Sequence, residues 1–585
     1  MNRYLLPFLA FALLGLTALV YMPGLSGGFI FDDYPNIVTN QAVQPESLSW
    51  EGLRRAASAY QPGAYGRPLA TISFAIDYLI GGKDAWQFKL TGLLVHLINA
   101  SLVFWLLLRL FALPGIRNTW HPIAAAAIAL FWATNPQQVS SVLYVVQRME
   151  TLSLTFVLLA LIAYLRGRTQ QLRGERGWPW LAASVLLAGI GMLSKETAAL
   201  FPAYALALEL TVLGFESRSA RTTRLLKAAY ALGLALAAIA FVFWVLPQYT
   251  APNAFAGRDF TLTERLLTQL RVLPMYIGQI LLPLPSALTF YYDALPKSTG
   301  WLSPATTLLG GLFLLSLLVC AWLLRRRLPV AALGVLWFFA AHLLTSNVFN
   351  LELAFEHRNY FALLGVVLVV ADLVRLIPMR DGPALKYIAV GAVLLGFGAM
   401  ATVRSATWGN ELHLAMEMVS KYPDSPRASN DLATTYVGMS DSNPESPFYS
   451  MGAAEFERAS LLPSSSPLPE QGLILMAATT GQPVKAEWWD RLIHKINTRP
   501  IGPQENMAVI GLMNQRYRGI ELDDKRLTEA FTALLRRQPT ANLSAQFGDY
   551  ALRYLGDEAM ANKAFTAAVD LANKSTPDFA QKLAA

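Results

Sequence analysis

Residues 4–21 read YLLPFLAFALLGLTALVY and are followed, at residues 27–37, by GGFIFDDYPNI. The first stretch is apolar and long enough to cross a membrane. Asp32 and Asp33 stand just beyond its end, where a carboxylate close to hydrocarbon is costly unless it has a partner or a function. The glycines and Pro35 predict a turn rather than a continued helix. Two neighbouring carboxylates could take a proton from a hydroxyl group and hold a second group; alternatively, they mark only a solvated helix end.

The composition indicates an integral membrane protein with a smaller soluble part. Of 585 residues, 54% are hydrophobic and only 15% are charged, whereas soluble domains carry about 25% charged residues. The net charge of +8 arises from basic residues in short loops, which excludes a nucleic-acid-binding face. The single cysteine, Cys320, excludes an intrachain disulfide. Arg3 precedes the first apolar run and no small-x-small cleavage site follows it, so we expect an uncleaved anchor.

Apolar runs of spanning length recur as far as Val403 and predict an all-α fold, a polytopic membrane helix bundle. We expect about eleven spans, near residues 4–22, 88–110, 120–134, 150–165, 178–194, 198–214, 228–247, 301–324, 328–346, 360–377 and 386–403. Between residues 263 and 286, three prolines, Arg265 and Arg271 interrupt a leucine-rich run. That segment predicts a hairpin or an interfacial helix rather than a further span.

The loop charges predict the orientation. Basic residues gather in the loops on the side of the N-terminus, as at 166–176, 218–227 and 325–327, whereas the opposite loops hold most of the acids. The positive-inside rule therefore places the N-terminus in the cytoplasm. An odd number of spans then places the C-terminal part outside, which in a Gram-negative cell is the periplasm. We accordingly expect a protein of the bacterial inner membrane.

From about Ser405 the sequence becomes soluble, alanine-rich and amphipathic. Phe456-x-x-Ala459-x-x-Leu462 and Phe565-x-x-Ala568-x-x-Leu571 share one spacing, each with a small residue one turn upstream. Small residues where helices cross, with a large one filling the groove, resemble tetratricopeptide repeats. We expect two clear units and up to two degenerate ones; an unrelated α-hairpin domain is the alternative. The predicted domains are residues 1–404, in the membrane, and 405–585, in the periplasm.

With this topology, the unusual polar sequences all fall on the outer face. They are Asp32-Asp33, Tyr65 to Leu69, Asp77, Asn135 to Glu150, Ser194-Lys195-Glu196, Arg271, Tyr291-Tyr292-Asp293 and Glu356-His357-Arg358. Together they predict a cavity open to lipid and periplasm, with cations suited to a lipid phosphate and acids suited to proton abstraction.

Each of these residues also has a structural interpretation. Lys195 and Glu196 could neutralise one another at a helix turn. Arg148 and Arg358 could be headgroup anchors. His357 could be a structural hydrogen-bonding residue, and His96, inside the second span, fits a polar packing residue better than a ligand.

Several of these motifs resemble the membrane O-mannosyltransferases that carry C-terminal tetratricopeptide repeats. The matching segments are Phe31-Asp32-Asp33, Gly66-Arg67-Pro68-Leu69, Asp77 to Gly82, His96 to Ala100 and, most specifically, Leu193-Ser194-Lys195-Glu196. Val146 to Met149 and Phe355 to Tyr360 look like bacterial relatives of that group, some of which glycosylate type IV pilins. The chain has Asn135-Pro136 and Gln147-Arg148 where animal members have His-Pro and Gly-Arg, which leaves the sugar open.

The resemblance implies a GT-C glycosyltransferase fold and a polyprenyl-phosphate sugar donor. In this interpretation Asp32 is the general base that deprotonates an acceptor hydroxyl, and Asp33 orients that hydroxyl or a divalent metal ion. The phosphate of the donor would meet cations, for which the candidates are Lys195, Arg148, Arg271 and Arg358. The candidates for binding sugar and acceptor are Glu196, Glu356, His357, Tyr292 and Arg67.

The expected function is therefore transfer of a sugar to a hydroxyl group of a periplasmic protein, such as a pilin, that the repeat domain binds. One alternative is a GT-C transferase whose acceptor is a lipid or lipopolysaccharide. Another is a flippase for lipid-linked sugars, although no internal repeat of the membrane part is apparent. A third is a scaffold, for which a single span would suffice.

Overall fold

The computed structural model describes residues 4–60, 66–114, 116, 121–378 and 384–575, so Arg3 and Tyr65 lie outside the described residues. These residues form helices, turns and one isolated bridge, with no strand among them. The all-α prediction is therefore confirmed. The chain divides into two compact units. Unit 1 comprises residues 1–247, 263–290 and 297–414, and unit 2 comprises residues 248–262, 291–296 and 415–585.

Seven helical stretches, all built mainly from unit 1, are long and apolar enough to cross a membrane within the described ranges. They are Leu5–Gly24, Ala85–Phe111, Val145–Arg173, Glu196–Leu213, Ala220–Thr250, Thr306–Leu324 and Leu385–Trp408. They contain helices α1 (Leu5–Tyr21), α4 (Ala85–Phe111), α7 (Arg148–Arg173), α9 (Phe201–Leu208), α10 (Ala220–Ala240), α11 (Leu246–Thr250), α13 (Thr306–Leu324) and α16 (Ala384–Trp408).

The other four predicted spans fall on shorter apolar helices. These are α5 (Pro122–Ala133), α8 (Trp178–Met192), α14 (Pro329–Ala341) and α15 (Ala362–Leu376). Where α14 crosses α15, a Cβ on Gly334 would lie 2.3 Å from the carbonyl oxygen of Gly365. Small residues thus let these two helices approach as membrane helices do.

The leucine-rich run after residue 262 is one helix, α12 (Leu262–Leu281), with Pro274 inside it. The hairpin alternative is therefore wrong. Arg265 on this helix is fully buried and donates to the carbonyl oxygens of Thr345, Asn347 and Leu351. Because these bonds satisfy the guanidinium, an arginine that interrupts an apolar run can lie inside unit 1.

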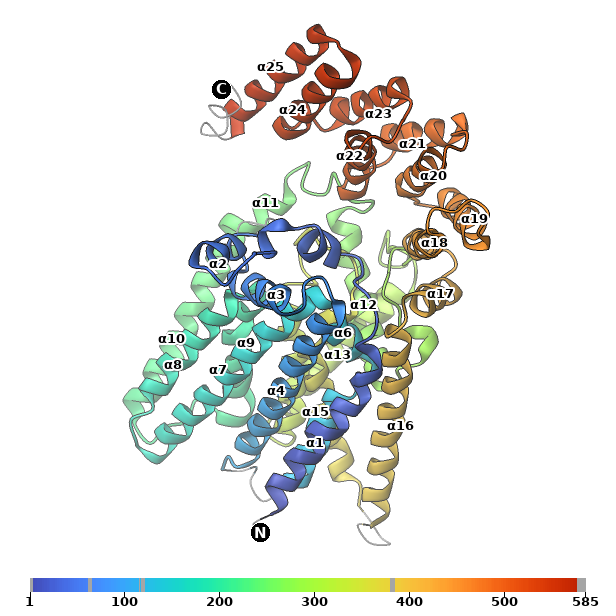
Figure 1. Cartoon of the computed structure of the whole chain (residues 1–585). Helices are drawn as coiled ribbons and strands as arrows, with labels where there is room; N and C mark the ends of the chain where they lie inside the picture. Colours follow the sequence, from blue (N-terminus) through green and yellow to red (C-terminus); the bar gives the residue numbers. More distant parts are fainter. Residues whose placement is uncertain (1–3, 61–65, 115, 117–120, 379–383, 576–585) are drawn as a thin grey trace. The chain divides into compact units, whose positions relative to one another are not determined.

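Two helices in the long segment between the first two spans were not predicted. Helix α2 (Trp50–Ala57) begins at the capping residue Ser49, and α3 (Pro68–Gly81) begins with a proline and ends at Gly82, whose φ is +61°. Both lie across the end of unit 1 that is remote from the N-terminus (Figure 1). They place this polar segment over the ends of the spanning helices.

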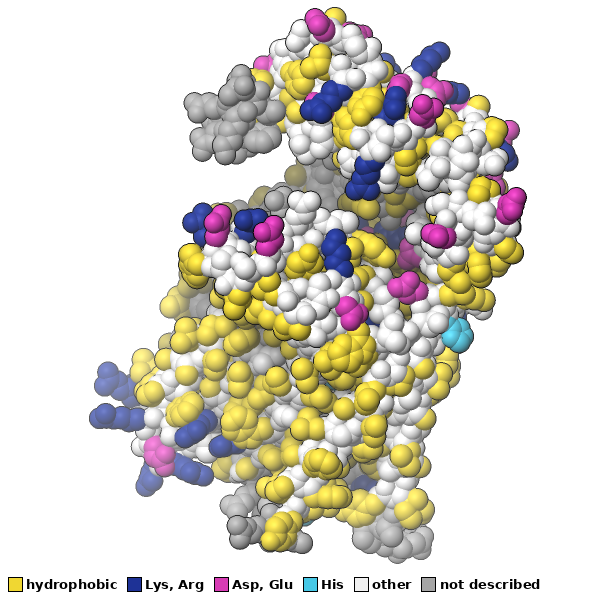
Figure 2. Space-filling view, in the orientation of Figure 1, with side chains coloured by type: hydrophobic (Ala, Val, Ile, Leu, Met, Phe, Trp, Pro, Cys, Tyr) yellow, Lys and Arg dark blue, Asp and Glu magenta, His cyan; other side chains and the backbone are white. Residues whose placement is uncertain are grey.

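The surface of unit 1 has the distribution expected of a membrane protein. Apolar side chains cover its flank, and basic side chains gather at one end of it (Figure 2). No residue in the most apolar window of Ala220–Thr250 is buried, and its Leu232 and Trp244 are 61% and 72% exposed. Side chains of this kind require a lipid environment rather than water. The orientation of the bundle in a membrane remains a prediction.

Unit 2 contains four consecutive helix pairs. They are α18 (Pro426–Ser440) with α19 (Pro447–Leu461), α20 (Leu468–Thr479) with α21 (Ala486–Thr498), α22 (Pro503–Tyr517) with α23 (Asp524–Arg537), and α24 (Ala541–Tyr550) with α25 (Glu558–Ser575). The large residues of the repeated motif fill grooves over glycines, since a Cβ on Gly472 would lie 2.5 Å from the Phe456 ring and one on Gly548 2.8 Å from Phe565. The boundary predicted at 404/405 falls inside α16, and helix α17 (Glu411–Lys421) follows it.

Two segments that lie before residue 405, residues 248–262 and 291–296, belong to unit 2. Tyr291 donates a hydrogen bond to Asp431 on α18, at 2.5 Å. Asp293 accepts from the Ser425 hydroxyl at 2.7 Å and from the Arg427 N–H at 3.1 Å, so it also supports the first turn of α18. A Cβ on Gly257 would lie 3.1 Å from the carbonyl oxygen of Ile501. The sequence had assigned these segments to the membrane part.

Candidate active site

The acid pair lies in a turn whose two carboxylates have different surroundings. Asp33 is fully buried, and its oxygens accept hydrogen bonds from the backbone N–H groups of Val146 at 2.7 Å and Ile30 at 3.1 Å. Burial raises the pKa of the Asp33 carboxyl to about 7, against the lowering by these two bonds. Asp32 is exposed, and its backbone N–H donates to the Tyr144 hydroxyl at 3.0 Å. Asp33 thus builds the turn that presents Asp32.

Strained backbone holds this turn. Phe31 has a φ of +45°, in the left-handed region that costs a non-glycine residue about 1–3 kcal/mol. Its ring packs edge-to-face on Phe290, 6.0 Å between centroids, and lies 6.5 Å from the ring of Phe355. Aromatic packing therefore stabilises a backbone conformation that a phenylalanine normally disfavours.

Lys195 and Glu196 form ion pairs with different partners. Lys195 Nζ lies 3.1 Å from Glu150 Oε2 and 3.2 Å from Gln147 Oε1. Arg67 binds Glu196 with two bonds, of 2.8 and 3.3 Å, and its guanidinium lies 4.2 Å from the centroid of the Tyr60 ring. The interpretation that Lys195 and Glu196 neutralise one another is therefore wrong.

Tyr60 and His357 connect these pairs to other candidates. The charges of Arg67, Glu196 and Asp32 all act on Tyr60, whose pKa burial raises. The charges of Lys195, Arg358 and Arg67 act on His357, and together with burial they lower its pKa well below the usual 6.5. His357 also stacks on Phe355, 5.1 Å between centroids. The acid turn, the ion pairs and the His357 imidazole thus share one neighbourhood of unit 1.

Arg148 makes its own set of buried contacts. It is buried, contacts Asp77 at 2.5 Å, and donates to the carbonyl oxygens of Phe88 at 2.6 Å and Ser73 at 3.3 Å. The guanidinium also faces the rings of Phe74 and Phe88. These contacts join α3, α4 and α7 and give Arg148 a structural role, so the headgroup-anchor interpretation is wrong.

The remaining candidates have separate positions. Glu356 is buried and pairs with Arg404 of α16 at 2.7 Å, while Arg358 donates to the carbonyl oxygen of Leu353 at 3.2 Å. Arg271, on α12, lies 3.5 Å from the Ser298 hydroxyl. Tyr292 belongs to unit 2, whereas the other candidates belong to unit 1.

Sequence reasoning assigned no role to three charged residues of this region: Lys89, Glu150 and Arg404. Lys89 is 1% exposed and lies within a span, and Arg404 lies one turn before the end of the last one. An ionisable residue inside a spanning helix was the signal that could have found both of them. His96 is a packing residue as expected, since its ring nitrogens lie 2.7 Å from the Tyr360 hydroxyl and 3.0 Å from the carbonyl oxygen of Ala133.

The acid pair does not fit a metal site in this arrangement. Both oxygens of Asp33 already accept backbone N–H groups, and a metal ion needs several oxygen lone pairs directed at it. Among the described residues, no group of three or more histidine, cysteine, aspartate or glutamate side chains could hold a metal ion. We therefore derive no step through a divalent ion.

Fold and surface define an integral membrane protein with a charged site at one end of its helix bundle. It is similar to Protein O-mannosyl-transferase Tmtc2 of Drosophila melanogaster, with 31% identity over 303 residues, 49% of this chain and 30% of that protein. It is also similar to Protein O-mannosyl-transferase tmtc2 of Xenopus laevis, with 30% identity over 189 residues, 31% of this chain and 21% of that protein. For TMTC2 of Homo sapiens the identity is 30% over 185 residues, 30% of this chain and 21% of that protein.

The chain thus spans less than a third of the length of these curated relatives. No family model matches the chain, and no solved structure matches it. The relatives support the resemblance to O-mannosyltransferases. The resemblance to pilin glycosyltransferases remains a prediction.

Proposed function

We propose that this protein is a membrane glycosyltransferase that moves a sugar from a polyprenyl-phosphate donor to a hydroxyl group of a protein. The observation that carries the proposal is the exposed Asp32, presented by a buried Asp33 and sharing the neighbour Tyr60 with the Arg67–Glu196 pair. The similarity to proteins named O-mannosyl-transferases supports the type of reaction.

In the proposed reaction, Asp32 takes the proton of the acceptor hydroxyl as its oxygen attacks the anomeric carbon. The bond between that carbon and the phosphate oxygen breaks, and the electron pair leaves on the lipid phosphate. Fixed cations stabilise this developing negative charge. Lys195 suits the role, since its ammonium has three N–H groups, of which Glu150 and Gln147 engage two, and a phosphate oxygen would take the third.

The cations of this site are already held by carboxylates, and this has a use in catalysis. Glu150 and Glu196 fix Lys195 and Arg67 before the donor binds, so little reorganisation is needed at the moment of reaction. Arg358 extends the positive field near His357. Glu196 would then accept hydrogen bonds from sugar hydroxyls, and His357 would bind a further hydroxyl, whereas the buried Glu356 is occupied by Arg404.

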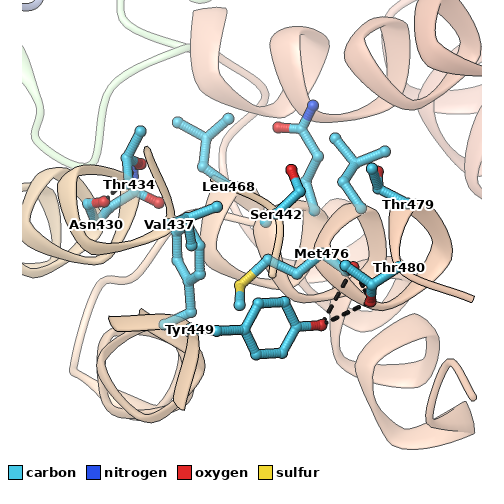
Figure 3. Close-up of a pocket in the computed structure, with 13 residues that line it drawn as sticks. Asn430, Thr434, Val437, Ser442, Tyr449, Leu468, Met476, Thr479 and Thr480 are labelled. Atoms are coloured by element: carbon cyan, nitrogen blue, oxygen red, sulfur yellow. Dashed lines mark hydrogen bonds between the residues drawn. The ribbon is translucent and has the colours of Figure 1, made fainter. Parts of the chain in front are cut away.

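The repeat-like unit would bind the protein acceptor. Unit 2 has a cavity of about 290 Å³ between α18, α19 and α20, shown in Figure 3. Its lining includes Asn430, Thr434 and Gln471 and no charged side chain. Tyr449 closes one side by contacting the Thr480 hydroxyl at 2.9 Å and the Met476 carbonyl oxygen at 3.2 Å. Amides and hydroxyls over an apolar floor suit an uncharged, extended protein segment.

We place the active site and unit 2 in the periplasm of a bacterium and the N-terminus in the cytoplasm. The basic end of unit 1 supports this orientation through the positive-inside rule. A reporter that is active only in the periplasm, fused after Ala585, should be active, and one inserted in the 166–176 loop should be silent. The opposite pattern would overturn the placement.

The intact masses of periplasmic proteins, pilins included, compared with and without this gene, test the proposed function. A glycosyltransferase with a protein acceptor predicts at least one protein that loses the mass of one or more sugars. If the proteins keep their masses and a lipid or lipopolysaccharide changes instead, the acceptor is not a protein. If cells without this gene accumulate lipid-linked sugar on the inner leaflet alone, the protein is a flippase.

A further inference from the structure

A buried lysine lies beneath the acid turn. Lys89, in the second turn of α4, is 1% exposed. Its Nζ lies 3.5 Å from the carbonyl oxygen of Gly24 and 3.4 Å from that of Trp408. Gly24 closes the first spanning stretch and Trp408 ends the last one. The ammonium therefore joins the outer ends of three spanning helices.

At Gly27 the turn approaches this lysine and the end of α16 so closely that only glycine fits. A Cβ on Gly27 would lie 1.9 Å from the carbonyl oxygen of Trp408 and 2.7 Å from Lys89 Nζ. A Cβ on Gly28 would lie 1.5 Å from Glu411 Oε1. The backbone of the turn is thus enclosed between the ammonium of Lys89, the end of α16 and the carboxylate of Glu411.

Charge explains why a lysine occupies this position. The ammonium acts on the carboxylates of Asp33 and Glu411. Burying an ammonium is costly unless carbonyl and carboxylate oxygens compensate it, and an apolar side chain would fill the same space without that cost. A charged residue inside a span is therefore a sign of function.

We propose that Lys89 is a positioning residue for sugar transfer, and this inference rests on the proposed function. Its ammonium fixes the segment from Gly24 to Asp33 against the ends of the first and last spans. Asp33 in turn holds the N–H groups of Ile30 and Val146, and Asp32 follows the orientation of this turn. Lys89 acts through the backbone and Asp33 and does not touch the substrate.

Three variants of the full-length protein test this inference. Lys89→Met keeps the length of the side chain without its charge, and Lys89→Arg keeps the charge. Lys83→Met is the matched control, because Lys83 is an exposed lysine just before the same helix. For each, we would measure kcat and donor KM per folded molecule, and amide hydrogen exchange of residues 24–34.

We expect Lys89→Met to lower kcat by about 10²-fold, the effect of a misplacement of about 1 Å, with donor KM unchanged and faster exchange of residues 24–34. Lys89→Arg should recover most of the rate, and Lys83→Met should match the unaltered protein. A normal kcat in Lys89→Met would overturn the inference, as would equal losses in Lys89→Met and Lys89→Arg with unchanged exchange.

Two further arms keep the outcomes separable. If Lys89→Met does not accumulate in the membrane, Glu411→Gln replaces it, since Glu411 lies at the exposed side of the same cluster. Glu411→Gln should then speed the hydrogen exchange of residues 24–34. Normal hydrogen exchange in Glu411→Gln refutes the inference. If the unaltered protein transfers no sugar, the proposed function fails. The exchange measurement still decides whether Lys89 fixes the turn.

Discussion

The Asp33 carboxylate accepts a hydrogen bond of 2.7 Å from the backbone N–H of Val146, 113 residues further along the chain. This contact ties the turn after the first span to the 3-10 turn Val145–Gln147, which leads directly into α7, the helix that carries Glu150. It gives the two acids separate roles, because Asp33 is used in structure while Asp32 remains exposed.

Asp33→Asn should destabilise the protein. An amide has one acceptor oxygen and an NH₂ group that would face a backbone N–H, so one buried donor loses its partner, at about 1–3 kcal/mol. We expect a lower thermal unfolding temperature in detergent. Asp32→Asn is the matched variant and should unfold at the temperature of the unaltered protein. Equal unfolding temperatures for all three would contradict the different roles of the two acids.

Lys195→Ala should weaken both donor binding and turnover, because the ammonium meets the phosphate before and during bond breaking. The double variant Lys195→Glu/Glu196→Lys swaps the two charges. It should not restore donor binding or turnover, since Lys195 pairs with Glu150 and Glu196 with Arg67. The measurements are donor affinity, acceptor glycosylation and membrane abundance. Full recovery of donor binding and turnover in the double variant would show that the two residues pair with each other after all.

The turn should be sensitive to a single methyl group. Gly27→Ala would place its Cβ 1.9 Å from the carbonyl oxygen of Trp408, whereas Gly15→Ala, inside α1, meets nothing within 4 Å. We expect Gly27→Ala to abolish most transfer and to expose residues 24–34 to hydrogen exchange. Gly15→Ala should behave normally. Unchanged transfer by Gly27→Ala would mean that the turn can shift without consequence.

Truncation after Leu414, the last residue of unit 1, should leave an inserted helix bundle, because units 1 and 2 bury separate cores. Residues 248–262 and 291–296 would lose their partners in unit 2, so limited proteolysis should cut there. We expect transfer to a protein acceptor to fall while donor binding persists. An equal loss of donor binding would show that unit 2 also completes the donor site.

Helix existence could be predicted from the sequence because long apolar runs have few other solutions in a membrane. The partners of the charged residues could not be predicted from the sequence. Lys195 and Glu196 are adjacent, but Lys195 has extended backbone, with φ −162° and ψ 148°, so successive side chains point to opposite sides. Arg148 resembled an exposed cation because its partner Asp77 lies on a helix that the sequence analysis took for a loop.

The most direct test of the central claim is the transfer rate of Asp32→Asn, which keeps shape and hydrogen bonding but cannot accept a proton. Loss of a general base typically costs about 10²–10⁴ in rate, and we expect this loss with normal abundance and normal donor binding. Glu51→Gln, which changes an exposed carboxylate of the same outer segment, is the control and should transfer normally. Normal transfer by Asp32→Asn at normal abundance would contradict the mechanism and return the acid pair to a structural role.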